Sequence, residues 1–513
     1  MAIRDRELLA DCIAGSKLDL LSGVSCKHPL DQEVVGRLSS LQQAIRNGDD
    51  DYEIFRHRAD IDILWKILLE KAIICLRYYD KREPFLGNPD KTPRAYGIDN
   101  LKQYYDKYTD FERILYGTSE YYRDHVIHVF RTWLSGIVHM TENNGKYLEE
   151  ISIHEDQGVH LEYVEKISIW TLIALTHDLG YPLQKAKNII EQTRKMVSTF
   201  ITNPDISIDF SFHGVQNYMN DFILRLMSSK MVKTDQKESE SYVARLQSKY
   251  YFKFQKSLER NDHGILSVLI VYKLLTYFLE SDYSLNEDYH FTEEDRRQFY
   301  IRREILRAIT THTCNDIYQM YIASFPLLLR ICDDTQEWGR KNISELYVSS
   351  SRQYELNSVE LRCSPERKSL CAIHERVVFP LKSGKTGADQ IDTGSVKNQI
   401  DQFRRQAADY IMIFRDGQDT IKRDFSFMRE LEIDCSSIKV ILTLKIPNNS
   451  SSELRGTIQY SPVKNKNDQM GISFWNEIKY LKLESLTGRD GLEAQEDDAS
   501  TWGKRFFTID LVG

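Results

Sequence analysis

The sequence predicts a mainly α-helical protein with N-terminal helices, a helical core and a smaller C-terminal α+β domain. Tyr (29) and Phe (22) are frequent among the 513 residues, while Gly (24) and Pro (11), which interrupt helices, are sparse. Before residue 350, apolar residues recur mostly at three- and four-residue intervals, the period of an amphipathic helix. A hydrophobic fraction of 41% and a charged fraction of 28% are ordinary for a globular chain of two or three domains.

Helical patterns dominate the first two predicted regions. In residues 1–120, the run IDILWKILLEKAIICLRYYD predicts a helix, and the turn-rich run EPFLGNPDKTPRAYG that follows predicts a break. Residues 121–347 are the predicted core. Within it, the stretch at about 230–247 is rich in Lys, Glu, Ser and Asp, so we expect a mobile or solvated polar insertion there. The helical runs of the core lie at 121–140, 167–180, 263–280 and 325–339.

The C-terminal part, residues 370–513, predicts a smaller α+β domain. Its short apolar runs VVFPL, IKVILTLKIP, GTIQYSPV and FFTIDLV are typical of strands. One longer run among them, SVKNQIDQFRRQAADYIMIF, has the helical period. We therefore expect one helix packed with several strands.

Charge and cysteine content favour a cytoplasmic protein without a membrane partner. The net charge of −8 gives no broad basic field for nucleic acid, although it leaves room for a local basic channel. The N-terminus lacks the apolar run of a secretory signal, and the most apolar stretch, Leu266 to Leu279, is short and contains Lys273. The eight cysteines form no C-x-x-C pair, which indicates reduced thiols and no zinc ribbon.

Histidine and aspartate residues border several of the predicted core helices. In THDLG, His177 and Asp178 are adjacent and follow the apolar run IWTLIAL. Any one of these residues alone is more often a core histidine or a helix cap than a ligand, but the ordered set is unusual. The other members are His125 and His128 upstream, and His263, His312, Asp333 and Asp334 downstream.

This order of residues resembles the HD superfamily of metal-dependent phosphohydrolases, over roughly residues 121–340. The resemblance implies that His128, His177, Asp178 and Asp333 bind one divalent ion, and that His263 and His312 are ligands of a second. His128 is preferred to His125 because HVFRTWLSG resembles the opening helix of that family, and Asp333 to Asp334 because a small residue, Cys332, precedes it. His125, His213 and Asp334 stay as alternatives.

The resemblance also implies a cofactor and a reaction. Mixed imidazole and carboxylate ligands suit Mn, Fe, Co, Ni or Zn, as one ion or two. Metal-activated water would attack a nucleotide or related phosphate ester, with His177 and Asp178 at the catalytic centre. Lys185 is expected to take part in catalysis and to bind phosphate together with Arg131. Lys187 and Arg330 are further cations near the ligands.

Other readings remain open. HDLGYPLQKA is similar to the HDxGxPP segment of deoxynucleoside triphosphate triphosphohydrolases, but Tyr181 and Gln184 or their neighbours stand where those enzymes carry histidines. A protein of another class, a non-catalytic ligand sensor or scaffold, would keep the cavity without turnover. A third reading is a nuclease partner in a larger system, and a homo-oligomer is compatible with all three. No Walker A loop, G-x-S-x-G elbow or G-x-G-x-x-G motif is present.

Overall fold

The computed structural model divides the chain into two compact units, which we describe separately. The helical unit contains Asp5–Ile317 and Ala323–Tyr347, and most of the other unit is Val348–Gly513. The structure describes residues 5–21, 28–45, 53–81, 93–118, 124–153, 159–199, 215–234, 241–286, 288–317, 320–321, 323–336, 355–363, 370–379, 393–414, 425–433, 439–446, 456–460 and 507–511.

The N-terminal helices pack on one another and on the core of the helical unit. Helix α2 (Gln32–Ala44) is capped at its N-terminus by Asp31, whose side chain accepts a hydrogen bond from the backbone N–H of Val34. Helix α3 (Arg58–Tyr78) runs beside α2 and presents a continuous apolar face that includes Trp65. The remaining elements of this region are α1 (Asp5–Gly15), a short 3₁₀ turn (Glu53–His57) and α4 (Ile98–Thr118).

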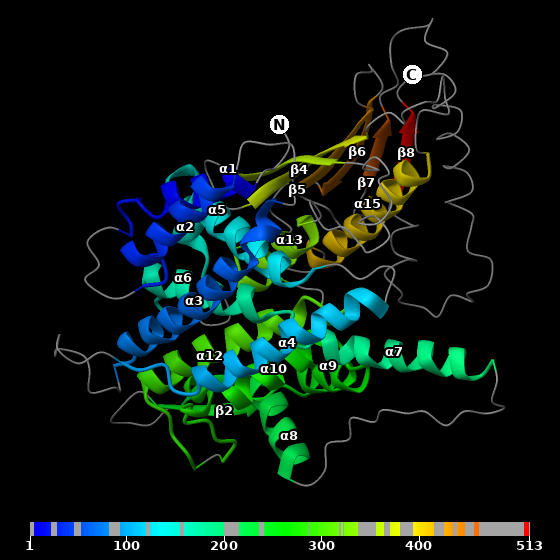
Figure 1. The fold of residues 1–513 in the computed structure, drawn as a ribbon. Coiled ribbons are helices and arrows are strands. Elements are labelled where there is room, and N and C mark those ends of the chain that lie inside the picture. Colours follow the sequence, from blue (N-terminus) through cyan, green and yellow to red (C-terminus); the bar gives the residue numbers. More distant parts are fainter. Residues whose placement is uncertain are drawn as a thin grey trace, which may run out of the picture. The chain divides into compact units, whose positions relative to one another are not determined.

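Helix α6 (Tyr163–Thr176) is the centre of the helical unit, because nearly every residue along it is buried. The helices α3, α5 and α12 surround it (Figure 1). Two indole N–H groups form hydrogen bonds with α6: Trp133 of α5 donates to Thr171 at 3.0 Å, and Trp65 of α3 donates to the backbone oxygen of Leu175 at 2.8 Å. The other helices of the core are α5 (Val126–Glu150), α7 (Tyr181–Val197), α10 (His263–Leu274), α11 (Thr276–Leu279), α12 (Glu293–Thr311) and α13 (Phe325–Thr335).

The polar insertion corrects one expectation from the sequence. Instead of a solvated connection, strands β1 (Ser229–Thr234) and β2 (Ser241–Leu246) form an antiparallel hairpin. Tyr242, Val243 and Ala244 are buried in β2, so this strand packs on the core although its neighbours along the chain are polar. Helices α8 (Val215–Ser228) and α9 (Ser248–Glu259) flank the hairpin.

The C-terminal unit is built on a four-stranded sheet with the order β3-β4-β5-β6. Strands β4 and β5 are parallel, and α15 (Thr393–Phe414) connects them and packs on β5 and β6. Arg429 of β5 is buried beneath this helix, where it pairs with Glu375 of β4. The strands are β3 (Glu355–Cys363), β4 (Leu370–Phe379), β5 (Phe425–Ile433), β6 (Lys439–Ile446), β7 (Gly456–Tyr460) and β8 (Phe507–Leu511); β7 pairs with β8 in parallel.

The fold class is confirmed as mainly α with a smaller α+β part. Two of its strands, β3 and β5, were not expected from the sequence, and β3 lies before residue 370, where we expected this domain to begin. Among the described residues, no helix combines the length and the apolar character that crossing a bilayer requires.

Candidate metal centre

Six side chains of the helical unit meet at the ends of five helices. His128 lies in the first turn of α5, and His263 is the first residue of α10. His177 and His312 directly follow the last residues of α6 and α12, and Asp333 lies in the last turn of α13. Asp178 stands in the short turn between α6 and α7. The structure therefore brings together all six residues that the sequence order selected as metal ligands.

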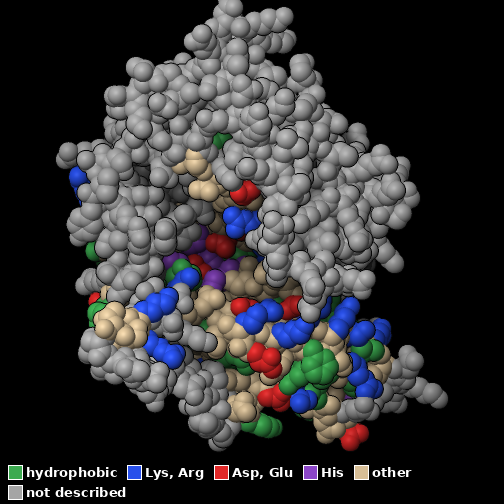
Figure 2. Space-filling view, turned by 90° about the vertical axis from the view of Figure 1, so that its right-hand side faces the viewer, with side chains coloured by type: hydrophobic (Ala, Val, Ile, Leu, Met, Phe, Trp, Pro, Cys, Tyr) green, Lys and Arg blue, Asp and Glu red, His purple; other side chains and the backbone are tan. Residues whose placement is uncertain are grey.

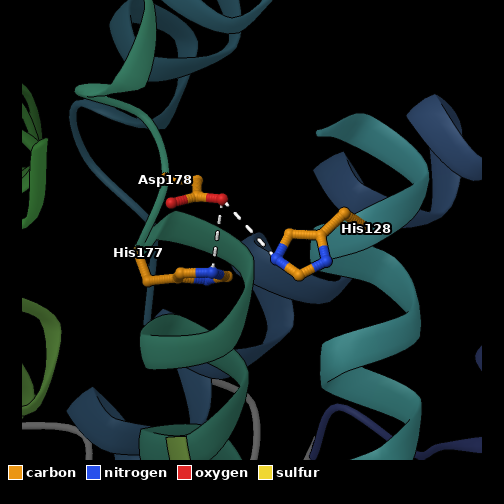
Figure 3. Close-up of side chains that lie close together, drawn as sticks. All are labelled: His128, His177 and Asp178. Atoms are coloured by element: carbon orange, nitrogen blue, oxygen red, sulfur yellow. Dashed lines mark ion pairs between the residues drawn. The ribbon is translucent and has the colours of Figure 1, made fainter. Parts of the chain in front are cut away.

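The first ligand group consists of His128, His177, Asp178 and Asp333. The Nε2 atom of His128 lies 2.8 Å from Asp333 Oδ1 and 3.7 Å from Asp178 Oδ2. The Nε2 atom of His177 lies 3.5 Å from Asp178 Oδ2 and 3.6 Å from Asp333 Oδ1. Figure 3 shows His128 on α5 facing His177 and Asp178 at the end of α6. Each imidazole of this group therefore lies within 3.7 Å of both carboxylates.

The second ligand group consists of Asp178, His263 and His312. The other oxygen of the same carboxylate, Asp178 Oδ1, lies 3.2 Å from His263 Nε2 and 3.7 Å from His312 Nε2. Within each of three overlapping sets drawn from the six residues, the ligand atoms lie within 4.8 Å of one another. Asp178 thus offers one carboxylate oxygen to each group.

The Nδ1 atom of each of the four histidines lies against an acceptor oxygen. His177 Nδ1 donates to the backbone oxygen of Ala174 at 2.8 Å, and His312 Nδ1 donates to that of Ile309. His263 Nδ1 donates to Gln184 Oε1 at 2.8 Å, and His128 Nδ1 donates to Gln336 Oε1. A neutral imidazole with its proton on Nδ1 keeps a lone pair on Nε2, so all four lone pairs point into the cluster.

This arrangement fits bound cations. Among the described residues, His177 Nε2 is buried without a hydrogen-bond partner, although it faces two carboxylates. His263 Nε2 and His312 Nε2 lie 3.1 Å apart with their Nδ1 atoms already used as donors. Lone pairs that converge on one another and on carboxylate oxygens repel unless a positive charge lies between them. The donor set therefore could hold a metal ion.

The electrostatics of the cluster agree with this interpretation. Burial opposes ionisation of Asp178 and Asp333, but the surrounding histidines hold the pKa of both carboxyls well below the usual range. Burial also disfavours the charged form of His177, yet the adjacent Asp178 and Asp333 raise its pKa to about 9. Without an ion, a proton on His177 would supply part of the missing positive charge.

Two glycines permit the helices to approach closely enough to form the second group. A Cβ atom on Gly180 would lie 2.4 Å from the backbone oxygen of His263. A Cβ atom on Gly264 would lie 2.7 Å from the backbone oxygen of Ile309 and 3.1 Å from His312 Cε1. Because neither glycine has a side chain, the start of α10 packs against both the α6–α7 turn and the end of α12.

Access differs across the cluster. The side chains of His128 and His177 have relative exposures of 1% and 0%, whereas His263 and Asp333 retain 18% and 24%. In Figure 2, histidine and acidic side chains are visible together on one face, near lysine and arginine side chains. The open side of the centre is therefore the side of His263 and Asp333.

Comparisons with protein-family models, curated proteins and solved structures give no match to this chain.

The alternative ligands lie outside both groups or outside the described residues. His125 is buried next to α5, where its ring contacts that of Tyr181 at a tilt of 31° with centroids 3.8 Å apart, and its backbone N–H donates to Glu112 at 2.6 Å. Asp334 accepts a hydrogen bond from Arg330 at 3.3 Å. His213 and the side chain of Lys187 lie outside the described residues.

The two predicted phosphate-binding cations differ in position. Lys185 Nζ lies 5.0 Å from the ring centroid of Tyr181, whose ring also contacts His263, so it stays near the open side of the cluster. Arg131 does not fit the role, because its side chain is buried and makes two 2.7 Å hydrogen bonds with Asp5. We correct the assignment of Arg131 to a structural ion pair, since its planar guanidinium already binds a carboxylate.

Sequence reasoning missed the groups that orient the ligands. Gln184 and Gln336 each accept from a histidine, but neither residue type nor spacing distinguishes them from surface glutamines. Glu112 was also missed. Its side chain is fully buried and pairs with Arg58 at 2.6 Å, and Arg58 also pairs with Asp124 at 3.1 Å. Asp124 in turn accepts from the backbone N–H of Ile127 at 2.6 Å, which anchors the start of α5 and hence His128.

Proposed function

We propose that this protein is a divalent-metal-dependent hydrolase of phosphate esters or anhydrides, with an HD-type centre and a nucleotide or related phosphate ester as substrate. The observation that supports it best is the set of four histidines whose Nδ1 atoms are held by acceptor oxygens. Their Nε2 atoms converge on two carboxylates, one of which is shared. Structural ion pairs do not need this many oriented lone pairs.

The first group would hold one ion through His128, His177, Asp178 and Asp333, and the second group a further ion through Asp178, His263 and His312. This mixture of imidazole and carboxylate suits Mn, Fe, Co, Ni or Zn. Ions bound there would supply Lewis-acid activation of a phosphoryl group and of a water nucleophile.

Residues of the chain itself would position the substrate. Lys185, beside Tyr181 at the open side, can neutralise charge on a phosphoryl group. His125 lies next to Tyr181, with its Nδ1 atom 3.7 Å from Glu112 Oε1. Asp178, at the centre, would orient the attacking water.

The test combines metal analysis with turnover. Purified wild type, Asp178→Ala and the control Asp106→Ala would be examined by elemental analysis and for hydrolysis of bis-p-nitrophenyl phosphate and a nucleotide panel with added Mn. Asp106 is a suitable control because it is an exposed carboxylate, 60% accessible, that pairs with Lys66 at 2.7 Å. We expect about one or two transition ions per chain in wild type and in the control, and loss of metal and turnover in Asp178→Ala.

Other outcomes separate the alternatives. Release of triphosphate from a deoxynucleoside triphosphate would indicate a triphosphohydrolase instead of a phosphodiesterase. Metal binding without turnover of any phosphate substrate would favour a ligand sensor or scaffold. Absence of metal from wild type after loading with Mn, Fe, Co, Ni or Zn would overturn the proposal.

A further inference from the structure

Helix α9 exposes a basic face. Lys249, Lys253 and Lys256 follow one another at four- and three-residue intervals, so their side chains lie on one side of the helix. Lys249 and Lys256 are exposed and Lys253 is half-buried. Phe254 and Ser257 are buried and form the side of α9 that packs inward. Lys249 and Lys256 therefore face solvent, and Lys253 lies at the border of the buried side.

An exposed aromatic ring lies among these lysines. Phe252 has a relative exposure of 63%, and it shares the side of α9 that carries Lys249 and Lys256. Tyr218, on the neighbouring helix α8, is 75% exposed. Phenylalanine is usually buried, so an exposed ring between cations is an unusual feature of a surface. Rings in this setting stack with unpaired bases while the cations bind phosphates.

The lysines of the basic face influence one another electrostatically. Burial lowers the pKa of Lys253, and the positive charges of Lys249 and Lys256 lower it further, against the opposing effect of Asp316. Asp316 is itself paired with Arg260 at 2.9 Å. Mutual repulsion among lysines of this kind is relieved by a polyanion. The face thus has a local positive charge although the chain has a net charge of −8.

The basic face ends close to the second ligand group. Helix α9 ends at Glu259, and His263 begins α10 after only Arg260, Asn261 and Asp262. Ser257 of α9 donates to Asp262 at 2.8 Å, which ties the two helices at this turn. Cys314, two residues beyond His312, contacts the backbone oxygen of Lys253 through its sulfur at 3.8 Å. Both histidines of the second group are therefore joined to α9.

We propose that the basic face of α9, with Phe252, binds a single-stranded nucleic acid and directs its phosphates to the open side of the metal centre. A helix of this length extends for about 18 Å, so it can contact several successive phosphates. The inference rests on the proposed function for the identity of the centre, and it specifies the substrate class as a nucleic-acid strand. A solvated lysine-rich face would explain the charges, but it would not explain the exposed Phe252 between them.

The experiment measures binding separately from hydrolysis. Fluorescence anisotropy with a labelled oligothymidylate, in chelator, would compare full-length wild type with the triple variant Lys249→Gln, Lys253→Gln and Lys256→Gln. The control triple variant Lys17→Gln, Lys81→Gln and Lys107→Gln removes the same charge from exposed lysines elsewhere. We expect the α9 variant to bind on the order of 10- to 100-fold more weakly. We also expect its log–log salt dependence to be shallower by about 2, since each lost phosphate contact changes this slope by about 0.7.

A second pair of variants tests the ring. Phe252→Ala should weaken binding roughly 5- to 100-fold with little change in the salt slope, because stacking is lost and no charge is removed. Met196→Ala, at an equally exposed apolar position of α7, should have no effect. If the triple variant fails to fold, the double variant Lys249→Gln and Lys256→Gln changes only exposed positions.

Several results would overturn the inference. These are no oligonucleotide binding by wild type, equal losses in the α9 and control variants, or binding to phosphatidylserine vesicles in place of the oligonucleotide. Hydrolysis of bis-p-nitrophenyl phosphate by the same proteins tests the metal centre independently. If that hydrolysis is absent while oligonucleotide binding depends on α9, the proposed function fails and the binding surface stands.

Discussion

Asp333 and Asp334 are adjacent carboxylates with different partners. Asp333 lies against His128 and His177, whereas Asp334 pairs with Arg330. We expect Asp333→Asn to weaken metal binding, because an amide provides no anionic ligand. Loss of a residue that only hydrogen-bonds to a metal ligand lowers metal affinity roughly 10- to 100-fold, and loss of the ligand itself should lower it at least as much. Asp334→Asn should keep its metal. Isothermal titration with Mn of both apo-proteins measures the difference, and equal losses would show that the structure does not distinguish the two positions.

Gln184 has a role that depends on one atom. Its Oε1 atom accepts from His263 Nδ1 at 2.8 Å and so keeps the lone pair of His263 Nε2 directed at Asp178. We expect Gln184→Leu to reduce affinity for the second ion by about 10- to 100-fold, since the ring can then rotate or exchange its proton. Gln184→Glu should restore most of the affinity. A competition titration with a chromogenic chelator would measure both, and unchanged affinity in Gln184→Leu would remove this role.

At the scale of elements, close packing at Gly180 determines whether α10 reaches the centre. A methyl group there would meet the backbone oxygen of His263 at 2.4 Å and Leu266 Cβ at 2.6 Å. We expect Gly180→Ala to destabilise the fold by about 1 to 3 kcal/mol and to lower metal content, because α10 must shift. Gly36→Ala is the matched control, since nothing lies within 4 Å of its Cβ position in α2. Denaturant unfolding of Gly36→Ala should show no decrease in the free energy of unfolding, and an increase of up to about 1 kcal/mol.

Lys166 links α6 to the end of α5 in a pH-dependent way. Its Nζ donates to the backbone oxygens of Leu148 and Glu149 at 2.8 and 2.9 Å, and burial lowers its pKa to about 8 from the ordinary lysine value of 10.5. Between these two values the unfolded state binds more protons, so the free energy of unfolding from this group rises as the pH rises. We expect wild type to gain stability relative to Lys166→Met between about pH 8 and pH 10. If urea titrations show that the difference in free energy of unfolding between the two proteins is constant over this pH range, the lowered pKa of Lys166 is contradicted.

The sequence predicted the helical elements better than the contacts between them. Long amphipathic runs such as the one that forms α3 carry a clear period, and the order of histidines and aspartates indicated which residues would meet. The hairpin β1–β2 was missed because its strands are short and polar on one side, so burial of Tyr242 depends on tertiary packing. Gln336, Glu112 and the pairing of Arg131 with Asp5 were not predictable, since they follow from how helices distant in sequence pack.

At the scale of the whole molecule, all six candidate ligands belong to the helical unit. Ions that bind only the folded form stabilise it, by about 2.7 kcal/mol when the free metal is 100 times its dissociation constant. We therefore expect calorimetry to show a metal-dependent transition for the helical unit and a metal-independent one for the C-terminal unit. Chelator should lower only the first, and Asp178→Ala should be insensitive to it. A chelator effect on both transitions, or on neither, would contradict this assignment.

The separation of the ligands along the chain determines when the centre can form during synthesis. His128 and Asp333 are 205 residues apart, which at about 5 to 20 residues per second takes roughly 10 to 40 s to translate. The second ligand group is complete once His312 has been made, whereas the first must wait for Asp333. During synthesis the second ligand group would therefore be complete before the first, although the first ligand to be made, His128, belongs to the first group.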